Sequence, residues 1–277
     1  MVFTVDGLNK LRDSIVTDWD WGAFGAPSSA ITPSETDDYM NGEIERVARS
    51  SATSTIDKRA DLEFLLSSVQ GNGETLRAFG VFETDQTVLE DGEATADWSA
   101  AGDAAISADS SIYKVGSNSM KFAMTYSTGA GTGTKTTSIG DLSALTGVNS
   151  GTPTQGTITM WVYVDDVSDL NATDGIVYRV GSGASDYAEG KLQASSLTDA
   201  TWYSWGIDLR NATITGTPDW TDVDYQLMTV NCTANVNAYF DSMLFNGPMG
   251  VYESLPALEK TNAKEVTVTL ITEVDNE

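Results

Sequence analysis

The fold of this chain is constrained most by two strand-like segments that stand near its opposite ends. Residues 73–84 contain a nearly continuous apolar run that needs cover on both faces, and the residues directly after it supply none. Residues 264–275 alternate aliphatic side chains mostly with threonines, which is the period of a half-buried strand. We therefore predict that both segments belong to one domain, formed by residues 1–85 and 249–277. Residues 86–248 would then form a second domain inserted into the first.

The charge of the chain excludes several classes of partner. Acidic residues number 40 and basic residues 15, which gives a formal net charge of −25. Such a surface repels nucleic-acid backbones and anionic membranes, so we expect neither nucleic-acid binding nor membrane insertion. Two explanations of the charge stay open: an ordinary soluble protein with a hydrated acidic surface, or a protein that works in high salt, where ions screen the self-repulsion. The scarcity of lysine and the abundance of aspartate favour high salt.

Histidine is absent from the sequence, and cysteine occurs once. There is no histidine, which removes the commonest general base and the commonest metal ligand, and Cys232 is the one cysteine, which excludes an intrachain disulfide. Catalysis by paired carboxylates remains possible, but 40 acidic residues bring such pairs together by chance. We therefore do not expect an enzyme.

No apolar segment reaches the length of about 18 residues that a membrane span needs.

The N-terminal region is predicted to mix helix, loop and strand. Residues 5–16 have apolar side chains at helical spacing, with Asp6 placed to cap the start of the helix. Residues 17–33 are predicted to form a loop whose aromatic side chains either pack onto the domain or make an intermolecular contact. Residues 36–50 are predicted to form a short helix or a helix-to-strand transition, and residues 61–69 a strand.

These segments, with the C-terminal one, resemble a known family. The matching residues are Thr75, Leu76, Arg77, Gly80, Val81, Phe82, Glu259, Lys260, Thr261, Glu265 and Val268. The pattern resembles small structural domains of tailed viruses, and residues 86–248 stand where those relatives have a short loop. The resemblance implies a discontinuous α+β anchor domain located in a virion, bound to other virion proteins and to copies of itself as a homo-oligomer, with a trimer favoured. Together with the charge, it implies a virus of a haloarchaeal host.

Residues 98–245 differ in composition, with few basic residues and many glycines, serines and threonines. Seven strand candidates occur there, at residues 111–115, 119–126, 157–164, 176–181, 201–209, 225–231 and 237–245. Short strands that are separated by glycine-rich turns, without a long helical period, indicate an antiparallel sandwich. The one expected helical turn lies at residues 141–145. We therefore predict a chain that is mainly β.

The insert itself resembles jelly-roll β-sandwiches of the carbohydrate-binding-module and concanavalin-like kind. The supporting segments are residues 110–122, 159–164, 178–187, 202–209 and 238–245. The resemblance implies an inserted antiparallel jelly-roll β-sandwich that acts as a binding module, with a host cell-surface glycan or glycoprotein as its partner.

The aromatic residues of the insert form the candidate ligand surface. A sugar ring presents an apolar face of C–H groups that stacks on an indole or a phenol, while acids, amides or arginine take its hydroxyls. Strand alternation places Trp202 and Trp205 on opposite faces, so one of the two belongs to the core. Filling of the sandwich is the alternative role for every ring. The candidate glycan-binding residues are Trp161, Tyr163, Tyr178, Arg179, Tyr187, Trp202 and Trp205.

Asp241 is the candidate metal ligand because it is an acid inside an otherwise apolar strand, where an unpaired carboxylate is costly. In the jelly-roll modules that the insert resembles, an acid at this place joins one from the first strand to hold a structural calcium ion. That resemblance implies Glu90 or Asp91 as the partner of Asp241. The alternative is a carboxylate at a strand edge that accepts a backbone N–H.

The leading functional hypothesis is a virion structural protein, in a tail fibre, baseplate or capsid spike, that displays a jelly-roll module for attachment to host-surface glycans. One alternative is a purely structural capsid or tail component whose module binds neighbouring subunits. A glycan lyase or hydrolase is the less favoured alternative, because it would need two carboxylates about 5 to 9 Å apart in an aromatic cleft.

Overall fold

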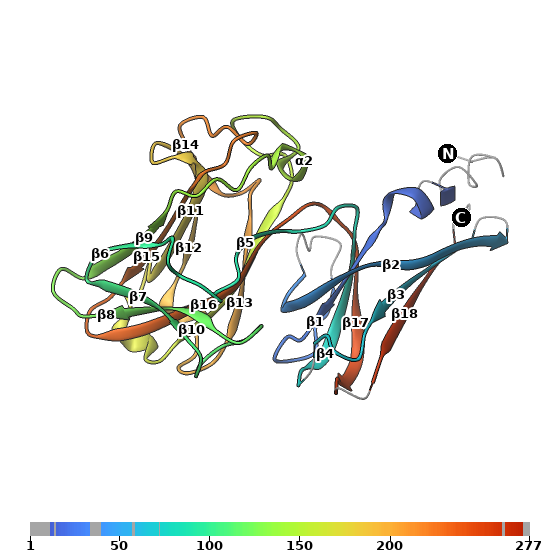
Figure 1. Ribbon diagram of the computed structural model, residues 1–277, viewed down its shortest axis with the longest axis horizontal. Coiled ribbons are helices and arrows are strands. Elements are labelled where there is room, and N and C mark those ends of the chain that lie inside the picture. The colour runs from blue at the N-terminus through green and yellow to red at the C-terminus, as the bar shows by residue number, and fades with distance from the viewer. Residues whose placement is uncertain are drawn as a thin grey trace. The chain divides into compact units, whose positions relative to one another are not determined.

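The computed structural model describes residues 12–13, 15–33, 40–56, 59–71, 73–261 and 264–273. The chain divides into two compact units, which are drawn in Figure 1. Unit 1 is formed by residues 1–85 and 248–277, and unit 2 by residues 86–247. Strands dominate the described part of both units. Within those described ranges, no helix is long and apolar enough to cross a membrane.

Unit 1 contains a six-stranded antiparallel sheet with the strand order β17-β4-β1-β2-β3-β18. Its strands are β1 (Trp21–Gly25), β2 (Glu43–Ile56), β3 (Arg59–Leu66), β4 (Thr75–Phe82), β17 (Met249–Glu259) and β18 (Val266–Glu273). The last two strands of the chain are therefore part of the sheet that the N-terminal region builds. β17 pairs with β4, and β18 pairs with β3.

Two segments of unit 1 differ from their sequence predictions. Residues 43–50, expected in a short helix or a transition, belong to strand β2, because pairing with β1 and β3 outweighs the local helical spacing. Residues 17–33, expected as a loop, contain β1, whose Phe24 ring lies 5.3 Å from that of Phe79. The helix predicted over residues 5–16 lies largely outside the described residues, and its described end is helical.

The sheet of unit 1 curls upon itself. β3 and β4 are separated by β1 and β2 in strand order, yet the rings of Phe64 on β3 and Phe79 on β4 have centroids only 5.4 Å apart. Gly22 on β1 makes this curl possible, because a Cβ atom there would lie 2.5 Å from Cδ1 of Phe64. With Phe24, these fully buried rings form the aromatic core of the unit.

Unit 2 is a sandwich of two antiparallel sheets. The β16 sheet has the order β13-β10-β16-β8-β7, with β5 also paired to β16, and the β11 sheet has the order β14-β12-β11-β15-β9-β6. The strands are β5 (Thr87–Glu90), β6 (Ser99–Gly102), β7 (Ala104–Asp109), β8 (Ser119–Met124), β9 (Ala130–Lys135), β10 (Thr157–Val164), β11 (Ile176–Gly183), β12 (Asp186–Leu192), β13 (Tyr203–Asp208), β14 (Thr213–Thr215), β15 (Tyr225–Asn231) and β16 (Val236–Asn246). The short helices are α2 (Ser143–Thr146), η1 (Val167–Asp169) and η2 (Ala194–Ser196). A mainly β chain with an antiparallel β-sandwich, as predicted, is confirmed.

Residues 111–115 were predicted to form a strand and form a loop instead. The backbone N–H groups of Lys114 and Val115 donate to Oδ2 of Asp241, at 2.7 and 2.9 Å, and are therefore not available to a neighbouring strand. The helical turn predicted at residues 141–145 is present as α2, one or two residues further along the chain.

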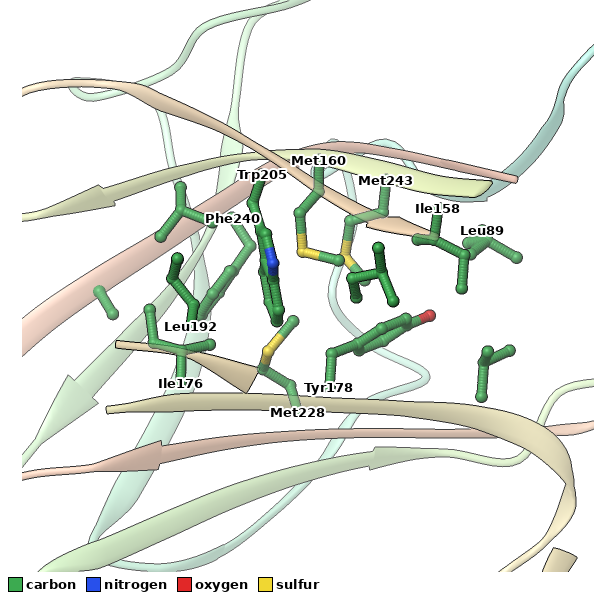
Figure 2. Packing of buried hydrophobic residues seen from close by; sticks show 14 of the residues in the cluster. Leu89, Ile158, Met160, Ile176, Tyr178, Leu192, Trp205, Met228, Phe240 and Met243 are labelled. Atoms are coloured by element: carbon green, nitrogen blue, oxygen red, sulfur yellow. The ribbon is translucent and has the colours of Figure 1, made fainter. Parts of the chain in front are cut away.

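The core of unit 2 lies between its two sheets, and Figure 2 shows part of it. Met160, Trp205, Phe240 and Met243 enter from the β16 sheet, and Ile176, Tyr178 and Met228 from the β11 sheet. Every strand residue that enters this core leaves its sequence neighbours on the outer face of the same sheet, which is the face turned away from the other sheet. The outer faces are therefore where a ligand surface has to be sought.

Candidate functional site

The seven predicted glycan-binding residues are distributed over three layers of unit 2. Tyr178 and Trp205 belong to the core, where they are 1% and 5% exposed (Figure 2). The Tyr178 hydroxyl donates to Oε1 of Gln226 at 2.6 Å, and burial raises the pKa of this tyrosine well above its ordinary value. Contrary to the prediction, neither Tyr178 nor Trp205 offers a ring to a ligand, because strand alternation turns both of them inward.

Arg179 and Tyr187 lie on the outer face of the β11 sheet. The pairing register sets six residues there in two adjacent cross-strand rows, one of Glu189, Arg179 and Leu227 and the other of Tyr187, Gly181 and Tyr225. We call these six residues the β11 grid. Strands β12, β11 and β15 each contribute one residue to each row, so the grid is held by backbone pairing on both sides of β11.

The Arg179 side chain is the central group of the β11 grid. Its Nε donates to Oε2 of Glu189 at 2.7 Å, and its Cζ lies 4.6 Å from the centroid of the Tyr187 ring. Lys191 approaches the other oxygen of Glu189, at 3.6 Å. Within the described ranges, neither Nη of Arg179 donates to a protein acceptor, and the side chain is 32% exposed. The guanidinium is therefore fixed on one edge and open on the other.

Tyr187 and Tyr225 converge over Gly181, with ring centroids 6.5 Å apart. Gly181 has to be glycine at this point, because a Cβ atom would lie 2.2 Å from the carbonyl oxygen of Asp186 on β12. Burial raises the pKa of Tyr225, and the charge of Arg179 partly offsets that effect, so the Tyr225 hydroxyl stays a protonated donor at neutral pH. Among the described residues, neither tyrosine hydroxyl has a protein hydrogen-bond partner.

The β11 grid thus combines two kinds of group in one place. Tyr187 and Tyr225 are each 9% exposed, so each supplies a small aromatic contact surface, and the guanidinium, the hydroxyls and the Glu189 carboxylate supply donors and an acceptor. Sugars require both kinds, because each ring has an apolar C–H face and a rim of hydroxyls. Sequence analysis found Arg179 and Tyr187 but missed Glu189, Gly181 and Tyr225. The signal for Glu189 was available, since it lies two residues from Tyr187 and shares its face.

Three other predicted residues, Trp161, Tyr163 and Trp202, gather on the outer face of the β16 sheet. The ring of Tyr163 lies 5.5 Å from that of Trp202 and 5.4 Å from that of Tyr239, which the sequence analysis missed. Trp161 lies on the same face but is only 4% exposed, with Nζ of Lys114 4.8 Å from its ring. Trp161 is thus packed beneath the loop of residues 110–118 and is not open to a ligand.

The three predicted calcium ligands do not form a common site. The buried Glu90 carboxylate accepts hydrogen bonds from Trp98 Nε1, at 2.6 Å, and from Lys135 Nζ, at 3.0 Å. Although burial acts to lower the pKa of Lys135, its hydrogen bonds to Asp97 and Glu90 raise it, so the charge of Glu90 is balanced by a lysine. Asp91 is exposed and accepts the N–H of Glu93 in its own turn.

Asp241 is the one predicted calcium ligand with unused capacity. It is fully buried, and its Oδ1 has no hydrogen-bond partner in the part of the chain that the structure describes. Burial raises its pKa to about 7, against the hydrogen bonds from Val115 and Lys114 that lower it. No group of three or more acidic or cysteine side chains suited to a metal occurs among the described residues. A calcium site of Asp241 with Glu90 and Asp91 therefore does not fit this fold.

The arrangement of strands in this chain is similar to that in several solved structures. No family model and no curated protein matches the chain. It is similar to the family 11 carbohydrate-binding module from Clostridium thermocellum in complex with a beta-1,3-1,4-mixed-linked tetrasaccharide, at 14% identity over 59% of this chain and 96% of that one, with a TM-score of 0.41. It is also similar to a family 30 carbohydrate-binding module, at 13% identity over 64% and 90% of the two chains with a TM-score of 0.41. An exo-beta-agarase matches at 9% identity over 63% and 25%, with a TM-score of 0.43.

Proposed function

We propose that unit 2 is a carbohydrate-binding module and that the β11 grid is its site. The observation that supports this proposal most directly is the state of Arg179. Its guanidinium is stacked on Tyr187 and bonded through Nε to Glu189, while both Nη groups remain available to a ligand. Water can solvate these exposed donors in the free protein, and a sugar hydroxyl can take the place of that water without breaking the bond to Glu189.

Binding at the grid follows from the chemistry of its groups. One face of a sugar ring packs against the exposed parts of Tyr187 and Tyr225. The sugar hydroxyls accept hydrogen bonds from the guanidinium and either donate to or accept from the tyrosine hydroxyls. The side chains are already held by the register of three strands and by each other. Little side-chain entropy is therefore lost on binding, which favours affinity for a small ligand surface.

The test is affinity electrophoresis of the full chain through gels that contain soluble polysaccharides, with neutral and uronate-bearing members in the panel. Arg179→Met keeps the aliphatic stem and removes the donors, and Tyr187→Ala removes a ring. We expect each variant to bind the retained polysaccharide about tenfold more weakly. Tyr126→Ala is the matched control, because Tyr126 is 51% exposed and lies outside the grid. Parent-like retardation of both grid variants would overturn the proposal.

We propose binding without catalysis. Glu189 is the only carboxylate of the six grid residues, and it is paired with Arg179 and Lys191. Glycoside hydrolysis by the usual route needs two carboxyl groups, one of them held protonated. Incubation of the retained polysaccharide with the chain should therefore leave its chain-length distribution unchanged, and release of short products would contradict this part of the proposal.

The role of unit 1 rests on the sequence resemblance to virion domains. We propose that it anchors unit 2 to a virion of a host that lives in high salt, so that many copies of the module present their sites together. Support comes from the sequence pattern and from the net charge of −25. Antibodies against the chain should decorate purified particles at a tail or a capsid spike, and a particle fraction free of the chain would refute the assignment. The predicted trimer stays a prediction, and so does calcium binding as such, although the three carboxylates named for calcium do not come together in one site.

A further inference from the structure

We propose that the outer face of the β16 sheet carries a second glycan-binding site, separate from the β11 grid. Its side chains are Trp202, Tyr163, Tyr239 and Lys121, which we call the β16 row. The row lies across the strands of one sheet of the sandwich, and the grid lies on the opposite outer face, with the hydrophobic core between them.

The register of the β16 sheet places these residues in one line. Tyr163 of β10 is directly opposite Tyr239 of β16, which is directly opposite Lys121 of β8. Trp202 directly precedes β13, whose Tyr203 is opposite Val162, so the same register brings Trp202 beside Tyr163. Ring distances of 5.5 and 5.4 Å agree with this order, and Nζ of Lys121 lies 5.3 Å from the centroid of Tyr239.

An aromatic row on this face is not explained by the core of unit 2. The inward positions of β10 and β16 already fill the sandwich with aliphatic, methionine and phenylalanine side chains. Outer faces of antiparallel sheets ordinarily carry polar residues. Tyr163 and Trp202 are nonetheless on the outer face and only half-buried, so part of each ring meets solvent, whereas Tyr239 is 4% exposed and supports Tyr163 through a ring contact without being open to a ligand. Two adjoining, partly exposed rings on the outer face of a sheet indicate a surface that a ligand covers.

The shape of the row favours a chain-like ligand over a protein partner. On one side the row is bordered by Ser204, and on the other by Asn237, whose amide and backbone N–H both bond to Asp165. Trp161, on the same side as Ser204, is packed beneath the loop of residues 110–118. The apolar surface is therefore about one residue wide. A protein interface of standard size buries about 800 Å² on each partner, which such a strip does not provide.

Ring orientation and charge narrow the ligand further. The Tyr163 plane is turned by 56° from that of Trp202, so the two rings that meet solvent cannot both lie flat on a crystalline surface. They suit a single soluble chain whose successive sugars meet differently inclined rings. Lys121 is paired with Asp109 at 3.7 Å, so the end of the row is close to neutral overall. We therefore assign a neutral glycan chain to the row.

Two sites on opposite faces have a functional consequence. One module can hold two glycan chains, or two segments of one long chain, and retention by a polysaccharide then exceeds what either site gives alone. Binding of a short oligosaccharide should accordingly reach two molecules per chain. Loss of either site should reduce the stoichiometry to one and leave the affinity of the other site unchanged.

The experiment compares two double variants of the full chain with the parent. Trp202→Ala/Tyr163→Ala removes the two solvent-facing rings of the β16 row, Tyr187→Ala/Tyr225→Ala removes both rings of the β11 grid, and Tyr126→Ala is the control. Soluble mixed-linkage β-glucan, xylan, galactan and mannan are screened by affinity electrophoresis, and a tetrasaccharide of the retained polymer is titrated by calorimetry. Near-UV circular dichroism verifies that each variant is folded. The single variant Trp202→Ala replaces the double variant of the β16 row if that is not folded, and Tyr187→Ala replaces that of the β11 grid.

We expect two tetrasaccharides per parent chain, one per chain in each double variant, and polymer retention at least tenfold weaker in each. If the β11 grid variant abolishes all binding and the β16 row variant behaves as the parent, the second site is refuted and the proposed function stands. If the β16 row variant abolishes all binding and the β11 grid variant behaves as the parent, the row is the site and the grid assignment is refuted. If the parent binds no member of the panel, both assignments are refuted.

Discussion

Replacement of Arg46 by methionine should destabilise unit 1 strongly, because Arg46 neutralises a carboxylate that has no access to water. Its Nε and Nη2 donate to the two oxygens of Glu43, each at 2.8 Å, and the two side chains are 1% and 2% exposed. The guanidinium carbon also lies 3.7 Å from the centroid of the Phe82 ring, which links the pair on β2 to β4.

The magnitude follows from the burial of this pair. Removing one partner of a buried, hydrogen-bonded ion pair costs about 3 to 5 kcal/mol, since the remaining charge is left uncompensated in the interior. Methionine keeps most of the apolar volume of the arginine stem, so little of this cost comes from a cavity. We therefore expect the unfolding free energy of unit 1 to fall by about 4 kcal/mol.

Unit 2 supplies a matched control with similar geometry and different exposure. Arg210 also donates through Nε and Nη2 to the two oxygens of one carboxylate, Asp208, at 3.0 and 3.1 Å, but its side chain is 42% exposed. Exposed pairs contribute about 0 to 1 kcal/mol, so Arg210→Met should have a small effect. Glu43→Leu combined with Arg46→Met should recover most of the loss, because no unpaired charge then remains.

Amide hydrogen exchange read by mass spectrometry is the appropriate assay, because a chain with two units does not unfold in one transition and exchange localises the change. Peptides from β1 to β4 should exchange faster in Arg46→Met, while peptides from the β11 and β16 sheets should not. If Arg46→Met changes unit 1 no more than Arg210→Met changes unit 2, burial does not control the strength of these pairs and the reasoning is wrong.

Two further predictions concern unit 2. The pKa of Asp241 is raised by burial from 3.8 to about 7, so the folded state holds this proton more tightly than the unfolded state. In the presence of a chelator, the contribution of Asp241 to the unfolding free energy should fall by about 3 kcal/mol as the pH rises from 4 to 7. Asp241→Asn should lack that slope in denaturant titrations at each pH, and an equal slope in parent and variant would disprove the assignment. Tyr178→Phe removes the hydroxyl that donates to Gln226 and should lower the unfolding free energy by about 1 to 2 kcal/mol. The variant should be retained by polysaccharide as strongly as the parent, because Tyr178 lies in the core. Weaker retention would show that Tyr178 takes part in ligand binding.

Local sequence patterns were sufficient for much of unit 2. Alternation of apolar and polar residues identified β10, β15 and β16 because a half-buried strand imposes its period on its own sequence. The same patterns missed β9, whose glycines hide the alternation, and they placed a strand at residues 111–115, where the backbone instead bonds to a distant carboxylate. In unit 1, residues 43–50 had helical spacing that pairing with β1 and β3 overrode.

The sequence by itself determined that this chain is mainly β, strongly acidic, and rich in aromatic residues on alternating strand positions. It could not determine which of the two faces of each strand meets the opposite sheet, and this choice put Trp205 in the core and Trp202 outside. Only the tertiary structure brought Arg179 beside Glu189 and Tyr163 beside Tyr239. Register is a property of two strands that lie far apart in the chain, so the residues that share a cross-strand row are decided by pairing and packing together.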